Sequence, residues 1–379
     1  MRVLVIDDSA PFRTQIRKVL ESIMGVEVVG TASNGKIGIS MLKQKAVDLV
    51  TLDLNMPVMD GLDTLKQIKA DASLGDVKVI VFAAKSARSA KDTLEALSLG
   101  AIDFIVKPDG ATFSLSDAAE QVSAQLAPRV KLFLKAQQSV VPVARAAGTT
   151  VTVPQSNISS TSGSIAGSRN QRLQSVSSNI ENAAFDMFRP KAVVIASSTG
   201  GPGALEAMFK HLRGPTLAPI LIAQHMPETF TKYLAKRIED ITGIEAREGE
   251  NGEKIKPNRI YVAPGDYHMS IIDGNGEACL KIDQGPRMHN VRPAADILFN
   301  SAADFFGKGL MSFVLTGMGE DGGAGAEYVK SLGGKCMIQD KESSVVWGMP
   351  MAVYERNAYD RMSNINECGR ILRQMVTKN

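Results

Sequence analysis

The sequence predicts two α/β domains joined by a linker, and three features support this fold class. Residues 1–120 alternate short, β-branched apolar runs with amphipathic stretches, the pattern of parallel strands covered by helices on both faces. Residues 138–187 are instead rich in Ser, Thr, Gly and Gln, the composition of a flexible linker. A second series of strands and helices is expected from residue 191 to the end. A chain of 379 residues suits about two domains.

Each element of the first domain follows from a local pattern. Apolar residues recur at helical spacing between the first two apolar runs, and a closing helix is expected over 115–137. The resulting fold is a doubly wound parallel sheet. Its strands are expected at 3–6, 26–30, 48–54, 77–83 and 104–108.

The second domain shows the same alternation of strands and helices. It also contains an expected β-hairpin over 267–282, whose turn is DGNG. We therefore divide the chain into a first domain over 1–125, a helix and linker over 126–187, and a second domain over 188–379.

Charges and cysteines limit the classes of function. The 43 basic residues nearly balance the 40 acidic ones, so composition gives no case for binding nucleic acid or anionic membranes. The 3 cysteines lack metal-ligand spacing and indicate a reducing compartment. The N-terminus begins in a strand, and no apolar run has the length of a membrane span. We expect a soluble, cytoplasmic protein that neither binds nucleic acid nor inserts into membranes.

Acidic residues follow the strands of the first domain. Asp7 and Asp8 end the first strand, Asp53 ends the third, and Asp60 lies in the next loop. Clustered carboxylates repel one another unless a cation lies between them, and oxygen ligands suit Mg²⁺. Lys107 follows the fifth strand and brings a positive charge to the same edge. The alternative is that these acids only cap helices, and for Asp60 a turn is the simplest interpretation.

The runs LVIDDS, LDLNMPVMDG and GAIDFIVKP make this domain resemble the response-regulator receiver family. The resemblance implies that Asp53 is the phosphoacceptor and that Lys107 pairs with the phosphoryl oxygens. It also implies a Mg²⁺ site made by Asp8, Asp53 and the backbone carbonyl of Asn55, with Asp7 acting through water.

One position departs from the receiver pattern. Ala83 stands where receivers usually carry a Ser or Thr that bonds the phosphoryl group. A hydrogen bond to a charged acceptor is worth roughly 1.5–3 kcal/mol. We expect phosphorylation of Asp53 to shift the domain between states poorly unless Ser86 or a backbone group replaces that bond.

In the second domain, the run AVVIASSTGGPGALEAMF over 192–209 takes a strand into a helix through a glycine-rich loop. Such a turn exposes a hydroxyl beside the free N–H groups of a helix N-terminus, as a nucleophile requires. Glycine-rich loops before helices also bind phosphate. From this stretch alone, both interpretations stand.

The four histidines differ in their expected places. His225 directly follows the apolar strand PILIAQ and is the best-placed base at the sheet edge. His211 is expected on a helix surface and His268 in the structure of the hairpin. His289 lies in a polar loop and is a candidate for substrate contact.

A carboxylate should orient the imidazole. Asp321 follows the strand SFVLT in a glycine-rich loop, although it could instead cap a helix. Asp296 and Asp340 are weaker candidates. A serine, a histidine and an aspartate that each close a strand can meet at one sheet edge, and their order along the chain indicates a convergent triad.

The runs ASSTGGPGAL, AQHMPETFT, IYVAPGDYHM, VRPAADILF, LTGMGEDGGAG and VVWGMP make the second domain resemble the chemotaxis protein-glutamate methylesterases of the CheB type. The resemblance implies a Rossmann-like α/β fold with Ser198 as nucleophile, His225 as general base and Asp321 as orienting carboxylate. Backbone N–H groups of Met318 and Thr199 would form the oxyanion hole.

The resemblance also implies a substrate and partners. The substrate would be glutamate methyl esters, and often glutamines, on cytoplasmic helices of chemoreceptors, and a chemotaxis-type histidine kinase would supply the phosphate. No cofactor is expected for the ester chemistry. Ser197 remains a rival to Ser198, because the family usually has an alanine at that place. A receiver-regulated phosphate- or nucleotide-binding protein, or a catalytically silent adaptor, is the alternative function.

Overall fold

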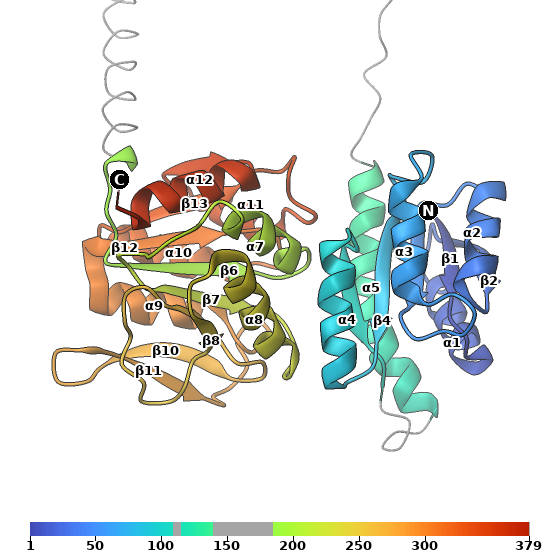
Figure 1. Cartoon of the computed structure of the whole chain (residues 1–379), viewed down its shortest axis with the longest axis horizontal. Coiled ribbons are helices and arrows are strands. Elements are labelled where there is room, and N and C mark those ends of the chain that lie inside the picture. The colour runs from blue at the N-terminus through green and yellow to red at the C-terminus, as the bar shows by residue number, and fades with distance from the viewer. Residues whose placement is uncertain (109–114, 139–184, 379) are drawn as a thin grey trace, which may run out of the picture.

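The computed structural model describes residues 1–108, 115–138 and 185–378, which form two α/β domains side by side (Figure 1). Most of the expected linker lies outside the described residues. Among the described helices, none is long and apolar enough to cross a membrane.

The first domain is a parallel sheet in the order β2-β1-β3-β4-β5, as the sequence predicts. The strands are β1 (Arg2–Ile6), β2 (Glu27–Ala32), β3 (Leu49–Asp53), β4 (Lys78–Ala83) and β5 (Asp103–Val106). The helices are α1 (Ala10–Glu21), α2 (Gly35–Gln44), α3 (Gly61–Ala70), α4 (Ala87–Ser98) and α5 (Leu115–Gln138). Helices α1 and α5 pack on one face of the sheet, and α2, α3 and α4 pack on the other.

Side chains at the strand ends start the helices of this domain. Ser9, Asn34, Asp60 and Ser86 each accept a backbone N–H from the first turn of the helix that follows. Asp60 accepts the N–H of Asp63 at 2.8 Å. Its carboxylate therefore caps α3, in keeping with its simplest interpretation as a turn residue.

The second domain is a parallel sheet in the order β14-β13-β12-β6-β7-β9-β8, with the expected hairpin beside it. The strands are β6 (Ala192–Ser197), β7 (Ile220–Gln224), β8 (Ala246–Glu248), β9 (Ile260–Val262), β10 (His268–Asp273), β11 (Ala278–Asp283), β12 (Leu310–Val314), β13 (Lys335–Gln339) and β14 (Arg361–Ser363). The helices are α7 (Gly201–Phe209), α8 (Phe230–Thr242), α9 (Ala295–Phe306), the short 3₁₀ helix η1 (Gly307–Gly309), α10 (Gly323–Ser331), α11 (Gly348–Glu355) and α12 (Ile365–Val376). Helices α7, α8 and α12 cover one face, and α9, α10 and α11 cover the other.

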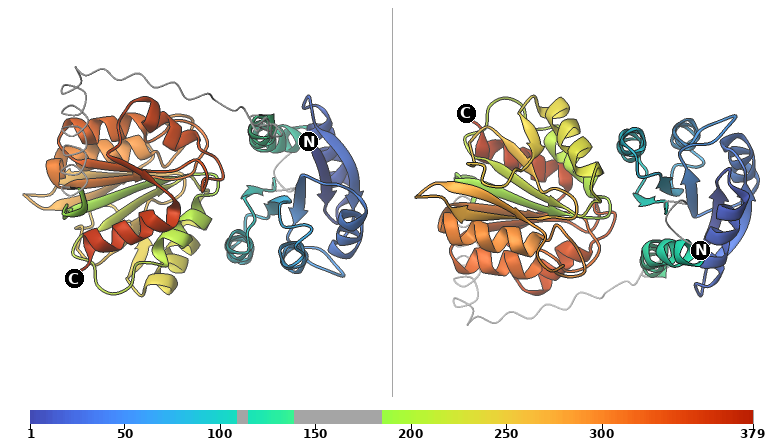
Figure 2. Two further views of the ribbon diagram at one scale, coloured as in Figure 1. Left: turned by 90° about the horizontal axis from the view of Figure 1, so that it is seen from above. Right: turned by 90° about the horizontal axis from the view of Figure 1, so that it is seen from below.

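The strand order places a crevice at the centre of this sheet. The chain leaves β6 toward β7 on one side, and β12 pairs with the other side of β6. In an open α/β sheet, ligands bind beyond the carboxyl ends of the strands at such a switch point. The loops that follow β6, β7 and β12 therefore meet at one edge, which faces the first domain in both views of Figure 2.

A substitution at Gly61 tests the packing of the first domain. A Cβ there would lie 2.3 Å from the backbone oxygen of Asp53 and 2.6 Å from the Cα of Leu54, and main chain cannot move aside cheaply. Gly61→Ala should therefore destabilise this domain by about 1–3 kcal/mol. Hydrogen exchange of the β3 amides should accelerate accordingly. Gly75→Ala is the control, because its Cβ would meet only one backbone oxygen at 3.7 Å. Equal exchange in both variants would contradict the prediction.

Candidate functional site

The register between β6 and β7 brings Ser198 and His225 together. Ser197 pairs with Gln224, so the next residue on each strand occupies a corresponding place at the sheet edge. The N–H of His225 donates to the carbonyl of Ser197 at 3.0 Å. Neighbouring strands lie about 4.8 Å apart. Ser198 and His225 both line one small cavity of about 50 Å³.

The glycines of the serine loop are required by close contacts. Gly200 has φ of 77°, a left-handed conformation that favours glycine, and it precedes the first turn of α7. A Cβ on Gly201 would lie 2.1 Å from Oε1 of Gln224. A Cβ on Gly317, in the loop after β12, would lie 2.9 Å from the Cβ of Ser198. The two loops approach each other so closely that only glycine fits.

The two neighbouring serines have different environments. Ser197 is fully buried, and its Oγ donates to Oε1 of Gln224 at 2.6 Å. Ser198 is partly exposed and lines the cavity. Gln224 also donates to the carbonyl oxygens of Ser198 and His225, at 3.0 and 3.1 Å. The hydroxyl of Ser197 thus anchors the loop, which leaves Ser198 as the accessible one.

His225 contacts the carboxylate of Asp321. Its Nε2 lies 2.7 Å from Oδ2 of Asp321, and both side chains are largely buried. An imidazole that donates through Nε2 keeps Nδ1 as its acceptor, because the partner of one ring nitrogen fixes the tautomer. Nδ1 is therefore the nitrogen available to a nucleophile.

The N-terminus of α9 holds Asp321. Oδ2 accepts the N–H of Ala295 at 2.6 Å, and Oδ1 accepts the N–H of Asp296 at 3.0 Å. Burial raises the pKa of Asp321, but the hydrogen bonds from His225 and these backbone groups outweigh it and bring the pKa below its usual value. Asp321 is therefore ionised at neutral pH and can orient an imidazole.

Two further residues adjoin Asp321 that the sequence did not connect to it. Asp296 is 2 % exposed. Its pKa is raised, first by burial and then by the negative charge of the nearby Asp321. His289, a candidate for substrate contact, has its Nε2 2.9 Å from Oδ2 of Asp296. No local signal pairs these two residues, because His289 lies in a loop and Asp296 in a helix.

The other candidates have structural contacts. His268 is buried, with Nε2 at 3.0 Å from the carbonyl of Pro286, in keeping with a role in the hairpin. His211 lies just after α7, where its Nε2 is 3.4 Å from the side-chain oxygen of Asn366. Asp340 accepts the N–H of Ser343 at 2.9 Å within its own loop.

Backbone donors lie near Ser198. The N–H groups of Thr199 and Met318 have no hydrogen-bond partner among the residues that the structure describes. The loop that carries Met318 is tied to the serine loop, because Oγ1 of Thr316 donates to the carbonyl of Thr199 at 3.0 Å. Backbone donors without a partner are the kind of group from which an oxyanion hole is built.

The first domain closes the cavity at Ser198. Its lining combines residues of β5 and α5 with residues of the second domain. The nine lining residues are Asp103, Phe104, Val106, Gln125, Arg129, Ser198, Thr199, His225 and Pro227. A space of about 50 Å³ is far smaller than the roughly 300–1,000 Å³ of typical ligand pockets, so residues of the first domain restrict access to Ser198 in this arrangement.

A carboxylate of the first domain binds the serine loop directly. Oδ2 of Asp103 accepts a hydrogen bond from Oγ1 of Thr199 at 2.8 Å and another from Nε of Arg129 at 2.6 Å. Beside it, the rings of Phe104 and Phe230 stack with centroids 4.7 Å apart. The interface therefore combines an apolar contact with a charged one at the mouth of the site.

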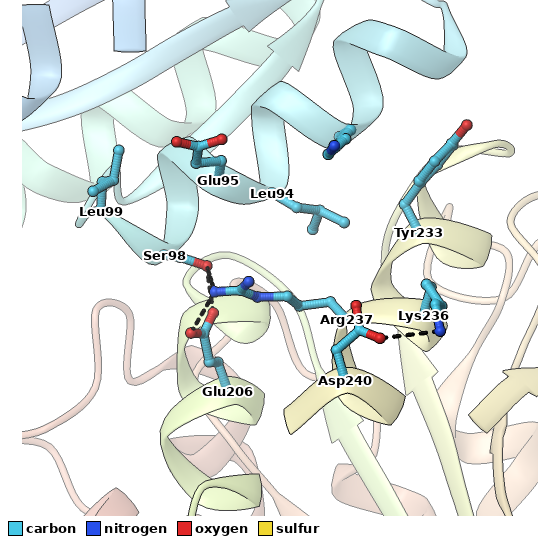
Figure 3. A pocket seen from close by; sticks show the side chains of 10 residues that line it. Leu94, Glu95, Ser98, Leu99, Glu206, Tyr233, Lys236, Arg237 and Asp240 are labelled. Carbon is cyan, nitrogen blue, oxygen red and sulfur yellow. Dashed lines mark hydrogen bonds and ion pairs between the residues drawn. The ribbon is translucent and has the colours of Figure 1, made fainter. Parts of the chain in front are cut away.

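A second polar contact lies between α4 and the pair α7 and α8 (Figure 3). Arg237 donates to Glu206 at 2.9 Å and to Oγ of Ser98 at 3.2 Å, and Ser98 also bonds Glu206. These groups line a more open interdomain pocket that Leu94 and Tyr233 border. Charged and apolar groups thus alternate across the interface.

The acidic edge of the first domain is also assembled. Nζ of Lys107 lies 2.8 Å from Asp7 and 2.8 Å from Asp53, and the oxygens of Asp7, Asp8 and Asp53 can all lie within 4.8 Å of one another. Burial raises the pKa of Asp53 to about 6, although Lys107 acts to lower it. Asp53 and Asp7 are both buried at this edge.

These residues fit a divalent cation. Asp8 is exposed, and three carboxylates converge with one lysine opposite them. Mg²⁺ prefers such oxygen ligands and keeps several waters, which the exposed side of the cluster allows. Asn55 is the second residue after β3, and its N–H donates to Oδ1 of Asp53 at 3.3 Å.

Ala83 and Ser86 lie at the end of β4. Ala83 is fully buried and offers no donor, and its carbonyl accepts the N–H of Lys107 at 2.8 Å. Oγ of Ser86 accepts the N–H of Ser89 at 3.2 Å and caps α4. The oxygen of Ser86 thus caps α4 as an acceptor, and its O–H is a separate donor.

Comparisons with known proteins agree with both halves of this arrangement. The family model of the CheB methylesterase matches residues 193–372, and that of the response regulator receiver domain matches residues 3–114. A protein-glutamate methylesterase/protein-glutamine glutaminase of Archaeoglobus fulgidus is 36% identical over 94% of this chain and 92% of its own. A second protein of that name, from Caulobacter vibrioides, is 38% identical over 97% of each chain. The crystal structure of the Thermotoga maritima CheB methylesterase catalytic domain is 40% identical, covers 49% of this chain and 99% of its own, and superposes with a TM-score of 0.48.

Restoring a hydroxyl at position 83 tests the departure from the receiver pattern. Ala83→Ser should tighten binding of the phosphoryl mimic beryllofluoride with Mg²⁺ by about tenfold or more, because a hydrogen bond to a charged acceptor is worth roughly 1.5–3 kcal/mol. The affinity can be measured by calorimetry on the whole chain. Ala84→Ser, at the exposed neighbouring position, is the control. If Ala83→Ser binds no more tightly than the control, the missing hydroxyl is not a handicap.

Proposed function

This chain belongs to the CheB family of receiver-linked protein-glutamate methylesterases, and we propose that Ser198, His225 and Asp321 perform its reaction. It is a receiver-regulated hydrolase that removes methyl esters from glutamate side chains of chemoreceptors. Its relatives carry the second name protein-glutamine glutaminase, and we extend deamidation of glutamine side chains to this chain. The observation that supports the triad best is the 2.7 Å contact between His225 and Asp321 beside the accessible Ser198.

The first half of the reaction forms an acyl-enzyme. Oγ of Ser198 attacks the γ-carbonyl carbon of the substrate glutamate ester while Nδ1 of His225 takes the hydroxyl proton. The carbonyl π electrons move to oxygen and give a tetrahedral oxyanion. Its collapse breaks the bond to the methoxy oxygen, and methanol leaves with the proton from His225. With a glutamine substrate, ammonia leaves instead.

The second half releases the product. Water attacks the acyl carbon while His225 takes one of its protons, and the second collapse returns that proton to Oγ of Ser198. The product is a free glutamate side chain. Throughout, Asp321 holds the imidazole in one tautomer and stabilises the imidazolium form.

Two backbone groups would stabilise the oxyanion. We assign this role to the N–H groups of Thr199 and Met318, which have no partner among the described residues. Removing one oxyanion donor from a well-studied protease costs about 2.7–4 kcal/mol. The glycines at 200, 201 and 317 let these loops approach the reacting carbon closely enough for such bonds.

Phosphorylation acts on the first domain. We propose that a chemotaxis-type histidine kinase donates the phosphoryl group to Asp53, with Mg²⁺ held by Asp7, Asp8, Asp53 and the carbonyl of Asn55. When bound, the cation neutralises charge on the phosphoryl oxygens. Lys107, which lies 2.8 Å from Asp53, would pair with the same oxygens. Because the receptor helices and the kinase are in the cytoplasm, we place the protein there as well.

The first domain would inhibit the esterase in the unphosphorylated state. Its residues reduce the space at Ser198 to about 50 Å³, and Asp103 binds Thr199, whose N–H we assign to the oxyanion hole. Inhibition would therefore have two parts, exclusion of substrate and restraint of the serine loop. Domain interfaces of this kind open for a few kcal/mol.

The triad is tested by methanol release from methylated receptor, with and without a phosphodonor. Ser198→Ala should abolish release because it removes the nucleophile. Ser197→Ala is the matched control and should keep most of the activity, since that buried hydroxyl bonds Gln224 and does not line the cavity. Full activity in Ser198→Ala would refute the assignment. A wild-type chain that releases no methanol under either condition would instead indicate a silent adaptor.

Inhibition by the first domain is tested by Asp103→Ala. Loss of its charged hydrogen bond should raise the unphosphorylated rate by about tenfold, since such bonds are worth roughly 1.5–3 kcal/mol. A fragment of residues 188–379 should give the upper limit of this rate. Asp76→Ala removes an exposed carboxylate elsewhere in the first domain and should change nothing. Equal rates for the fragment and the unphosphorylated whole chain would argue against inhibition.

A further inference from the structure

Asp296 is a buried carboxylate that contacts the loop of Asp321 without contacting the reacting groups. Its Oδ1 accepts the N–H of Gly322 at 2.9 Å and the N–H of Gly325 at 2.6 Å. Asp321 in turn accepts the N–H groups of Ala295 and Asp296. Asp321 therefore binds the start of α9, which carries Asp296, and Asp296 binds the start of α10, which directly follows Asp321.

The loop that carries Asp321 needs such an anchor. It reads GMGEDGGAG, and its five glycines could adopt many backbone conformations if they were free. Gly322, which directly follows Asp321, has φ of 87°. At Gly325, a Cβ would lie 2.9 Å from Oδ1 of Asp296, so glycine is required for this approach. The carboxylate of Asp296 thus selects one conformation for the residues after Asp321.

His289 completes the anchor at an unfavourable backbone position. His289 and Asn290 have φ of 51° and 61°, and the N–H of Val291 donates to the carbonyl of Met288 at 2.9 Å across them. Positive φ at both central residues is the geometry of a type I′ turn, which asparagine tolerates better than histidine. A histidine there places its Nε2 2.9 Å from Asp296. Backbone strain of this kind is usually associated with a functional contact.

The surrounding charges explain why a histidine is useful at this position. Two buried carboxylates face each other, and within the described part of the chain their hydrogen-bond partners are backbone N–H groups at the starts of α9 and α10 and the two histidines, His225 and His289. Glu320 lies on the other side of His289, with its Oε1 3.6 Å from Nδ1. Without His289, the second oxygen of Asp296 would face solvent with no donor from the described residues.

We propose that Asp296 is a positioning residue for the esterase reaction, held by His289, and that it fixes the loop so that Asp321 meets Nε2 of His225. The inference rests on the proposed triad. Its effect passes only through the geometry of Asp321, so it should act on the chemical step and not on substrate binding.

The test measures kcat and KM for methyl ester hydrolysis by the full-length chain with a phosphodonor present. Asp296→Asn keeps the shape but cannot accept from two glycine N–H groups and from His289 with the same strength. It should lower kcat by about 10- to 100-fold, the effect of misplacing a reacting group by an ångström, with KM within about twofold of wild type. His289→Ala should lower kcat by up to about tenfold, and His289→Gln, which keeps a donor, should recover most of it.

A second readout separates positioning from folding. A fluorophosphonate probe should label the Asp296→Asn chain to the same final extent as wild type but more slowly, because the site is present and its serine is less activated. The control is Asp304→Asn, since Asp304 accepts the hydroxyl of Tyr328 at 2.7 Å and also links α9 to α10, but at the exposed end. That variant should react like wild type.

Each outcome has a definite meaning. Wild-type kcat in both Asp296→Asn and His289→Ala overturns the inference, and so does an equal loss in Asp304→Asn. If Asp296→Asn does not fold, the partly exposed His289 decides through its two variants. Labelling of Ser198→Ala by the fluorophosphonate at the wild-type rate would instead refute Ser198 as the nucleophile. In that case Asp296 would have no triad to position.

Discussion

The register of β6 against its two neighbours is the constraint on which this molecule depends. Ser197 of β6 pairs with Gln224 of β7, and Ala196 of β6 pairs with Val314 of β12. The loops that follow β6, β7 and β12 therefore begin at the same edge of the sheet. A slip of one residue would turn every side chain to the opposite face of the sheet. The hydrogen bonds of Gln224 to Ser197 and to the carbonyls that follow both strands reinforce this register. The aligned strands place Ser198 and His225 on the lining of one cavity, and Asp321 lies 2.7 Å from His225.

Much of this arrangement could be predicted because it depends on local patterns. Short β-branched runs between amphipathic stretches determined the five strands of the first sheet, and all five form where expected. The positions of Ser198, His225 and Asp321 after three apolar runs indicated that they converge, since carboxyl ends of parallel strands share an edge. Glycines around them marked the tight turns.

The contacts that the sequence did not reveal depend on packing between distant segments. Asp103 and Thr199 are 96 residues apart and belong to different domains, so nothing near either one indicates their hydrogen bond. Asp296 looked like an ordinary helix residue, and its contact with His289 arises only when a loop folds over α9. The choice between Ser197 and Ser198 likewise required the side chain of Gln224, which comes from the neighbouring strand. The spacing of apolar residues predicts single helices and strands, but it does not predict which side chains of distant helices, strands and loops come into contact.

The mixed chemistry of the domain interface makes its closure reversible. The stacked rings of Phe104 and Phe230 favour contact, because separation would expose apolar surface to water. Elsewhere in the interface, Ser98 makes hydrogen bonds with Arg237 and Glu206 across the domains, and water can replace these bonds when the domains part. Separation therefore costs less than it would for a wholly apolar interface of the same area. An interface of this composition suits two domains that part and meet again, because interdomain contacts with polar groups open for a few kcal/mol.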